Sequence, residues 1–172
     1  MGFKDKLQTG WEQGKFVCVG LDPNDSLLPE HLLPRGEIRP GLVEQFCVKI
    51  VDATADIALA FKPNIAFFEK LGEPGHKILM RVCRYIRTTY PSVLLILDYK
   101  RGDIESTNDG YVALAFQHVE ADAITINPYL GLEANLPFLQ RSDRGVFVLC
   151  KTSNKGAGRY QDRLIVLAEE EA

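Results

Sequence analysis

Residues 92–104 read Ser-Val-Leu-Leu-Ile-Leu-Asp-Tyr-Lys-Arg-Gly-Asp-Ile, a short apolar run that is followed at once by charged residues. The apolar part is continuous rather than alternating, which is typical of a strand buried on both faces of a parallel sheet. If the strand continues, Asp98 and Lys100 point to the same face, about 6–7 Å apart along the chain. Gly102 then allows a sharp turn before Asp103. The segment predicts a buried strand whose carboxyl end presents charged groups.

The same pattern recurs along the chain. Further apolar runs, each expected to be a strand, lie at Phe16–Leu21, Ile57–Phe61, Ala123–Ile126 and Gly145–Cys150. Amphipathic helices are predicted between the strands, at 40–56, 76–89, 105–119 and 132–139, with another beginning at Tyr160 and a long loop at 24–39. Alternation of strands and helices predicts an α/β fold with right-handed crossovers. No linker composition interrupts the pattern, so a single domain over residues 1–172 is expected.

A polar or charged residue follows each apolar run. These residues are Asp22, Lys62, Asp98 with Lys100, Asn127, and Lys151 with Thr152 and Ser153. In parallel α/β folds the carboxyl ends of the strands converge on one crevice, and in (β/α)8 barrels they face a common central site. A charge directly after a buried run is costly unless it is paired. Five such strand ends therefore favour a shared functional site over ordinary loop polarity.

The charged residues nearest to the central run form a balanced set. Pro63 restricts Lys62 to an extended conformation, which is consistent with a side chain aimed inward. Together with Asp98, Lys100 and Asp103 it gives two lysines and two carboxylates, a neutral set that can be assembled in a confined site. Each lysine stays protonated beside an anion. A purely structural ion-pair network at a barrel mouth is the alternative interpretation of the same spacing.

Two further segments each allow two interpretations. Thr107 lies in the first turn of a predicted helix, where its hydroxyl either caps the helix or binds a phosphate near the helix N-terminus. Residues 151–158 read Lys-Thr-Ser-Asn-Lys-Gly-Ala-Gly. This loop is either a plain connector or a mobile segment in which the hydroxyls of Thr152 and Ser153 bind a polar heterocycle.

Composition excludes several classes of protein. The chain has 172 residues and a net charge of -3, without a basic stripe that would neutralise a nucleic-acid backbone. No apolar run approaches the roughly 20 residues of a membrane helix, and the N-terminus has no apolar signal core, so a cytoplasmic protein is expected. The four cysteines lie in apolar runs without a C-x-x-C pair, which predicts buried, reduced thiols and no metal site.

The motif Asp98-x-Lys100-x-x-Asp103-Ile104 resembles the D-x-K-x-x-D-I signature of the orotidine 5'-phosphate decarboxylases. Sugar-phosphate decarboxylases and aldolases of the same superfamily share the D-x-K-x-x-D core. Other segments are similar to the longer-chain bacterial and protozoan branch of the decarboxylases: Met1–Lys4, Gly20–Pro23, Phe61–Asn64, Asn127–Tyr129 and Lys151–Asn154. The resemblance implies a (β/α)8 TIM barrel, of which about five to six βα units would be present in this chain.

The resemblance also implies an activity, the cofactor-free and metal-free decarboxylation of orotidine 5'-monophosphate to uridine 5'-monophosphate in pyrimidine biosynthesis. Because no electron sink stabilises the resulting carbanion, preorganised charge must do so. The implied roles are Asp22 and Lys62 at the ribose hydroxyls, Asn64 in the ribose pocket, Asp98 against the substrate carboxylate, Lys100 as proton donor to C6, and Thr152 and Ser153 at the pyrimidine. Asp103 and Thr107 would reach into the active site of the partner in a homodimer.

Two features depart from the resemblance. Lys155 stands where that branch usually has proline. The chain also ends before the family's glycine-rich phosphate-binding segment and late arginine, and a whole barrel takes roughly 250 residues, so a truncated, split or incomplete chain is expected.

Two other functions stay open. One is a magnesium-dependent sugar-phosphate lyase, which needs a carboxylate where this chain has Lys62; the other is a catalytically inert fragment.

Overall fold

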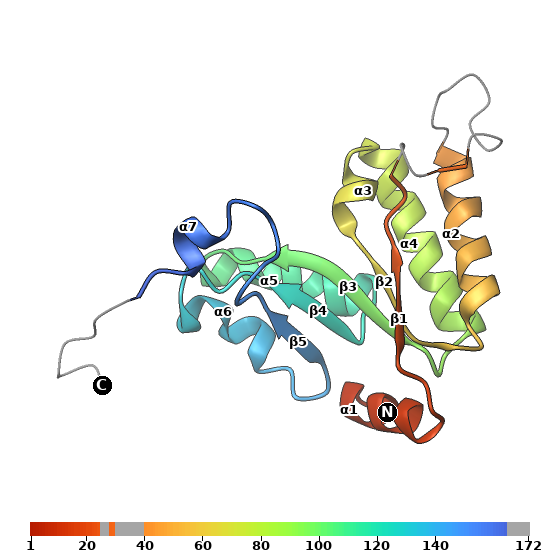
Figure 1. The fold of residues 1–172 in the computed structure, drawn as a ribbon, viewed down its shortest axis with the longest axis horizontal. Coiled ribbons are helices and arrows are strands. Elements are labelled where there is room, and N and C mark those ends of the chain that lie inside the picture. The colour runs from red at the N-terminus through yellow and green to blue at the C-terminus, as the bar shows by residue number, and fades with distance from the viewer. Residues whose placement is uncertain (25–27, 30–39, 165–172) are drawn as a thin grey trace.

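A single parallel sheet organises the computed structural model, which describes residues 1–24, 28–29 and 40–164 (Figure 1). Its five strands lie side by side in chain order: β1 (Val17–Leu21), β2 (Ala58–Pro63), β3 (Leu94–Arg101), β4 (Ala123–Ile126) and β5 (Gly145–Val148). A doubly wound sheet would reverse its strand order at a switch point. Uninterrupted sequential order is instead the arrangement of successive βα units in a barrel. The five predicted strands are confirmed, although β3 continues past Leu97 to Arg101.

Helices connect the strands. They are α1 (Phe3–Glu12), α2 (Pro40–Thr54), α3 (Ile65–Glu69), α4 (Gly72–Thr89), α5 (Glu105–Val112), η4 (Ala113–His118), α6 (Leu132–Leu139) and α7 (Gly158–Gln161). The predicted helix over 105–119 is one continuous run whose second half, η4, is a π-helix. The short helix α3 was not predicted, because its five residues are too few to show a helical period. The helix predicted from Tyr160 onwards ends at Gln161, so the prediction is wrong for residues 162–164, and the rest of it, at 165–172, lies outside the described residues.

Side chains of the strands alternate between two faces of the sheet, as the period of two requires. On the outer face, Phe61, Leu95, Leu97 and Ile124 pack against the helices in the main core. The inner face carries a smaller apolar cluster in which Ala60, Leu94, Ile96 and Ala123 meet Phe3, Leu7 and Leu59. Lys62, Asp98 and Thr125 follow the inner-face residues Ala60, Ile96 and Ala123 at a spacing of two. The alternation therefore carries these three polar side chains to the inner face at the carboxyl ends of the strands.

Helix α1 lies at the amino-terminal ends of the strands (Figure 1). The Lys6 ammonium lies 2.9 Å from Oδ1 of Asp122, a carboxylate that is only 5% exposed. The second oxygen of Asp122 accepts a hydrogen bond of 2.9 Å from the backbone N–H of Leu95. At Gly10 the helix comes so close to β2 that a Cβ atom would lie 2.3 Å from Cδ1 of Leu59. These contacts fix α1 across the end of the sheet that is opposite to the charged residues.

Two sequence predictions about burial are wrong at the edges of the sheet. Strands β1 and β5 are not buried on both faces, since Val17, Phe147 and Val148 are each more than two-fifths exposed. Of the four cysteines, Cys47 and Cys83 are buried, whereas Cys18 and Cys150 are exposed, and all four are free thiols. The reason is that, among the described residues, β1 and β5 each have a neighbouring strand on one side only.

None of the helices in the described part of the chain has the length and apolar character that a bilayer-spanning segment needs.

Candidate active site

Two lysines from neighbouring strands share one carboxylate at the carboxyl end of the sheet. Nζ of Lys62, on β2, lies 3.1 Å from Oδ2 of Asp98, on β3. The ammonium of Lys100 contacts the other oxygen, Oδ1, of the same carboxylate. Asp98 is 7% exposed, whereas both lysine side chains are partly open to solvent. The amines of residues 62 and 100 therefore meet at one buried anion, as the sequence pattern predicts.

A bulge in β3 turns Lys100 back onto Asp98. Leu97 pairs with Ile124, but the next paired residue of β3 is Arg101, opposite Ile126. Three residues of β3 thus face one residue of β4, and a bulge of this kind re-aims side chains next to active sites. Lys100 has a φ of 51°, in the left-handed region, which costs a residue with a Cβ atom on the order of 1 kcal/mol. The simple strand geometry expected for residues 98–100 is therefore wrong, although the two side chains do meet.

Thr125 on β4 fills the space opposite the bulge. Its Oγ1 accepts hydrogen bonds from the backbone N–H groups of Tyr99, at 2.8 Å, and Lys100, at 3.0 Å. The same hydroxyl donates to Oδ1 of Asp98 at 2.9 Å. The sequence pattern alone indicates no role for Thr125. The available signal was a single hydroxyl within the apolar run Ala123–Ile126, at the inner-face spacing from Ala123.

The surroundings of Asp98 favour its charged form. Burial alone raises the pKa of this carboxyl. Hydrogen bonds from Lys100, Thr125 and Lys62, together with the positive charge of Lys62, outweigh burial, so the pKa of Asp98 lies below its ordinary value. Asp98 is thus a fixed negative charge, held between two positive ones.

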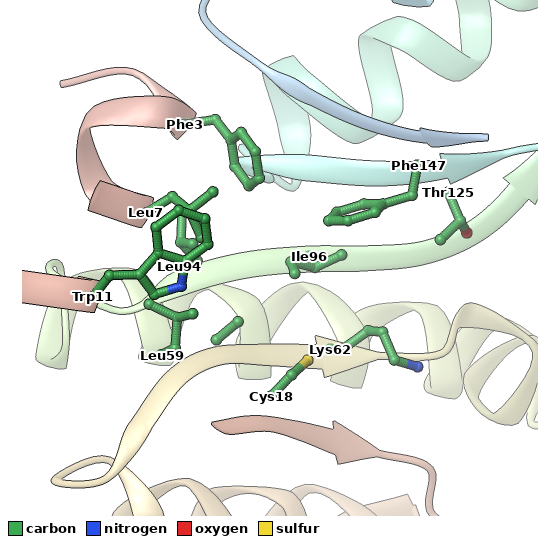
Figure 2. Close-up of a pocket in the computed structure, with 11 residues that line it drawn as sticks. Phe3, Leu7, Trp11, Cys18, Leu59, Lys62, Leu94, Ile96, Thr125 and Phe147 are labelled. Carbon is green, nitrogen blue, oxygen red and sulfur yellow. The ribbon is translucent and has the colours of Figure 1, made fainter. Parts of the chain in front are cut away.

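An apolar cavity of about 430 Å³ lies on the inner face beside this cluster. Figure 2 shows Phe3, Leu7 and Trp11 of α1 at one end of the cavity, with Lys62 and Thr125 towards the other. Cys18 of β1 also lines it; although the residue is exposed as a whole, partial desolvation raises the pKa of its thiol, and the nearby Lys62 partly offsets that effect. The cavity supplies a low-dielectric wall on one side of the charges, and charge–charge interactions are stronger in such surroundings than in water.

Two predicted residues lie at the ends of the neighbouring strands. Asp22 follows β1 directly and is exposed. Asn64 forms an isolated bridge to Asp98, and its backbone N–H donates to the carbonyl of Leu21 at 3.4 Å. Oδ1 of Asn64 accepts from the N–H of Ala66 at 3.2 Å and so caps α3. Both residues therefore lie at the same end of the sheet as the charged cluster.

Asp103 does not join the cluster of its own chain. In the described part of the chain it forms no ion pair with Lys62 or Lys100, so the prediction of four charges meeting within one chain is wrong, and only three do. The buried side chain of Asn108 instead holds the Asp103 backbone, accepting from its N–H at 3.1 Å and donating to its carbonyl at 2.6 Å. The Asp103 carboxylate accepts from the N–H of Ile104 at 2.7 Å. Asp103 is therefore held by hydrogen bonds to Ile104 and Asn108.

The neighbours of Asp103 modify two expectations. Gly102 has no left-handed φ; a Cβ there would lie 2.2 Å from the carbonyl oxygen of Asn127, so close backbone approach, not a sharp turn, requires glycine. Thr107 is exposed in the first turn of α5, whose N-cap is Ile104, without a side-chain cap. The helix-capping interpretation of Thr107 is therefore wrong.

The loop after β5 is tied to α7. The N–H of Thr152 donates to Oε1 of Gln161 at 2.7 Å, and Nε2 of Gln161 donates to Oγ1 of Thr152 at 3.0 Å. Lys151 pairs with Asp162, just past the same helix. Ser153 is exposed. Thr152 and Ser153 therefore lie at the carboxyl end of β5, in a short loop that is hydrogen-bonded to α7.

A family model described as orotidine 5'-phosphate decarboxylase / HUMPS family matches residues 15–171. The chain belongs to this family. The orotidine 5'-phosphate decarboxylase of Janthinobacterium sp. (strain Marseille) is 45% identical over 162 residues, which cover 94% of this chain and 58% of that protein. The orotidine 5'-phosphate decarboxylase of Roseiflexus sp. (strain RS-1) is 49% identical over 163 residues, with 94% and 57% covered. The chain thus spans less than two-thirds of the length of these curated relatives.

Solved structures of family members have the same fold. Leishmania donovani OMP decarboxylase matches with a TM-score of 0.83 and 37% identity, over 96% of this chain and 60% of that one. The structure of Leishmania donovani UMP synthase matches with a TM-score of 0.84 and 37% identity, over 96% of this chain and 34% of that one. The five strands and their helices are consecutive βα units of a (β/α)8 barrel, as predicted.

Within the described residues, no group of three or more His, Cys, Asp or Glu side chains is arranged to hold a metal ion.

Proposed function

We propose that the protein decarboxylates orotidine 5'-monophosphate to uridine 5'-monophosphate, with Lys62, Asp98 and Lys100 of this chain as its charged catalytic array. The observation that carries the proposal is the buried Asp98 carboxylate, which has one ammonium on each of its oxygens. Membership of the family supports the same reaction. The same proposal includes that residues 1–172 belong to a single domain and that the protein acts in pyrimidine biosynthesis in the cytoplasm.

The proposed chemistry requires no electron sink outside the protein. The bond between C6 and the carboxylate breaks, carbon dioxide leaves, and the electron pair stays on C6. Lys100 then gives its ammonium proton to C6 and becomes a neutral amine. Asp98 lies against the substrate carboxylate and repels it in the ground state, whereas the positive charge of Lys100 favours the developing carbanion. The left-handed turn at Lys100 holds that charge in place before substrate arrives.

The remaining site residues bind the nucleotide in this proposal. Asp22 and Lys62 take the ribose hydroxyls, and Asn64 lines the ribose pocket; all three come from the carboxyl ends of β1 and β2. Thr152 and Ser153 contact the pyrimidine from the loop after β5. The support is positional, because these residues share the edge of the sheet at which Asp98 lies, and polar groups at this edge form the ligand site in barrels.

A homodimer completes the proposal, with Asp103 and Thr107 reaching the partner's active site. Within the described residues Asp103 forms no ion pair with Lys62 or Lys100, and Thr107 is exposed. Two large apolar side chains that line one hollow with Ser106 are exposed as well, Ile104 at 62% and Leu130 at 50%. Exposed apolar groups that lie together mark association surfaces. Both observations support an interface at the loop after β3.

The sugar-phosphate lyase alternative fits the site less well. That reaction needs a carboxylate ligand for magnesium after the second strand, and β2 presents Lys62 there, paired to Asp98. The inert-fragment alternative makes a different prediction, since it requires that no uridine 5'-monophosphate be formed.

A turnover assay separates the three functions. Purified protein is mixed with orotidine 5'-monophosphate, and the appearance of uridine 5'-monophosphate is followed by chromatography, with and without EDTA. We expect EDTA-insensitive turnover that Lys100→Ala abolishes while nucleotide binding, measured by calorimetry, persists. Lys77→Ala, which removes an exposed lysine paired with Glu73, is the matched control and leaves turnover unchanged. Turnover retained by Lys100→Ala, or lost on adding EDTA, would overturn the proposal.

A further inference from the structure

The hydroxyl of Thr125 connects three separate groups of the bulged segment of β3. Its oxygen lies 2.8 Å from the backbone nitrogen of Tyr99, 3.0 Å from that of Lys100 and 2.9 Å from Oδ1 of Asp98. These three are consecutive residues, and Thr125 is the one residue of β4 that lies opposite them in the register. A single side chain therefore meets the whole segment that carries the charged cluster.

Geometry fixes the direction of the hydroxyl proton. A threonine hydroxyl has one proton to donate and two lone pairs with which to accept. Both backbone neighbours are N–H donors, so they occupy the two lone pairs. The proton is then left for Asp98, whose ionised carboxylate can only accept. A protonated Asp98 would accept this bond more weakly than the ionised carboxylate does, so the hydroxyl favours the charged form of Asp98.

The same contacts explain how the bulge persists. Where three residues of one strand face a single residue of its neighbour, the regular ladder leaves N–H groups without carbonyl partners. Oγ1 of Thr125 takes the place of a ladder carbonyl for two of them. Valine, which has the same shape, could not do this, and unpaired backbone N–H groups in a half-buried position are costly.

We propose that Thr125 is a positioning residue of this site, which holds the Asp98 carboxylate and the Lys100 backbone in the arrangement that decarboxylation requires. This inference rests on the proposed function and deepens it. Thr125 acts through Asp98 and Lys100, not by contact with the reacting atoms.

Asp98 is faced by titratable or charged groups from three strands. Cys18 comes from β1, Lys62 from β2, and Lys100 from β3 itself. Thr125 is a neutral group among them. A change at Thr125 therefore removes a hydrogen-bond donor without altering the number of charges around the carboxylate, and its effect on Asp98 can be attributed to the hydroxyl.

The first test is a carboxyl titration followed by NMR, with the Asp98 resonance assigned by its loss in Asp98→Asn. We expect Thr125→Val to raise the pKa of Asp98, because one donor to the charged form is gone, and Thr125→Ser to restore the wild-type titration. Thr54→Val is the matched control, since the Thr54 hydroxyl bonds to the Ile50 carbonyl of its own helix. Identical Asp98 titrations in wild type and Thr125→Val would overturn the proposal.

The second test is steady-state kinetics with orotidine 5'-monophosphate. Loss of one hydrogen bond to a charged group is expected to lower kcat about 10-fold to 100-fold in Thr125→Val, with KM little changed and Thr125→Ser close to wild type. The acidic limb of the pH–rate profile moves to higher pH in the valine variant. A merely structural role would lower the urea midpoint but leave kcat and the pH profile unchanged, and that result would overturn the proposal.

Two safeguards keep the tests decisive. If Thr125→Val does not fold, Thr125→Cys replaces it, because a thiol is a weaker donor than a hydroxyl. The pKa of Asp98 should then be higher in the Thr125→Cys variant than in Thr125→Ser. Equal pKa values in these two variants would reject the proposal. The carboxyl titration requires no turnover. If the wild-type protein forms no uridine 5'-monophosphate, the proposed function fails, while the titration still decides the role of Thr125.

Discussion

Lys62 on β2 and Asp98 on β3 form an ion pair of 3.1 Å between neighbouring strands, on the carboxylate oxygen that Lys100 does not use. Asp98 is therefore the one carboxylate with which both lysines pair. Removing a lysine leaves Asp98 one positive partner, whereas removing the Asp98 charge leaves two ammonium groups with no common anion. The cluster depends most on its single carboxylate.

Asp98→Asn should abolish most activity while preserving the fold. The variant keeps the shape of the side chain but loses the charge, and loss of one preorganised electrostatic group typically lowers kcat by about 100-fold or more. Asp56→Asn, an exposed acid after α2, is the matched control and should be near wild type. Steady-state kinetics and circular dichroism measure the two effects. Retention of more than about one-tenth of wild-type kcat would contradict this prediction.

The free energy of unfolding should decrease in acid, in part because Asp98 becomes protonated. The pKa of Asp98 lies below its ordinary value of 3.8 in the folded protein, because the hydrogen bonds from Lys100, Thr125 and Lys62 outweigh burial. A depressed carboxyl pKa stabilises the fold at pH values above the unfolded-state pKa, and this contribution is lost as pH falls from about 3.8 through the lower folded-state value. Urea unfolding of wild type and Asp98→Asn over this pH range should give stabilities that converge as pH decreases. Parallel curves would contradict the assignment.

The parts of the site that follow from the local sequence pattern could be predicted, whereas those that depend on contacts between strands could not. Strand positions follow from continuous apolar runs, and the alternation of side chains with a period of two carries Lys62 and Asp98 to one face. The bulge at residues 98–100 does not follow from those runs, because it depends on register with β4 and on the Thr125 hydroxyl. For the same reason the contact of Thr125 with three consecutive residues was not predicted. The conformation of Asp103 depends on a hydrogen bond to the buried side chain of Asn108, and nothing in the sequence around Asn108 indicates that this side chain is buried.

Asp122 should be the most sensitive acidic residue for stability outside the site. It is 5% exposed, and its oxygens meet the Lys6 ammonium at 2.9 Å and the Leu95 N–H at 2.9 Å. Asp122→Ala leaves both donors without an acceptor, which is expected to cost about 3 kcal/mol or more of unfolding free energy. Asp143→Ala, an exposed acid paired with Arg144, is the control and should cost less than about 1 kcal/mol. Equal urea midpoints for the two variants would show that the α1 anchor contributes little.

Two glycine-to-alanine variants should differ, although each introduces a close contact of similar length. At Gly102 a Cβ would lie 2.2 Å from the carbonyl oxygen of Asn127, and at Gly10 it would lie 2.3 Å from Cδ1 of Leu59. Leu59 can rotate away, and alanine improves helix propensity by roughly 1 kcal/mol at a helical position, so Gly10→Ala should be nearly neutral in stability. The Asn127 backbone cannot move without displacing the end of β4, so Gly102→Ala should cost about 1–3 kcal/mol. It should also lower kcat, because the shift reaches the segment between Lys100 and Asp103. Urea unfolding and kinetics of both variants measure these effects, and a Gly102→Ala protein with wild-type stability and turnover would show that the contact between the loop after β3 and Asn127 is not required.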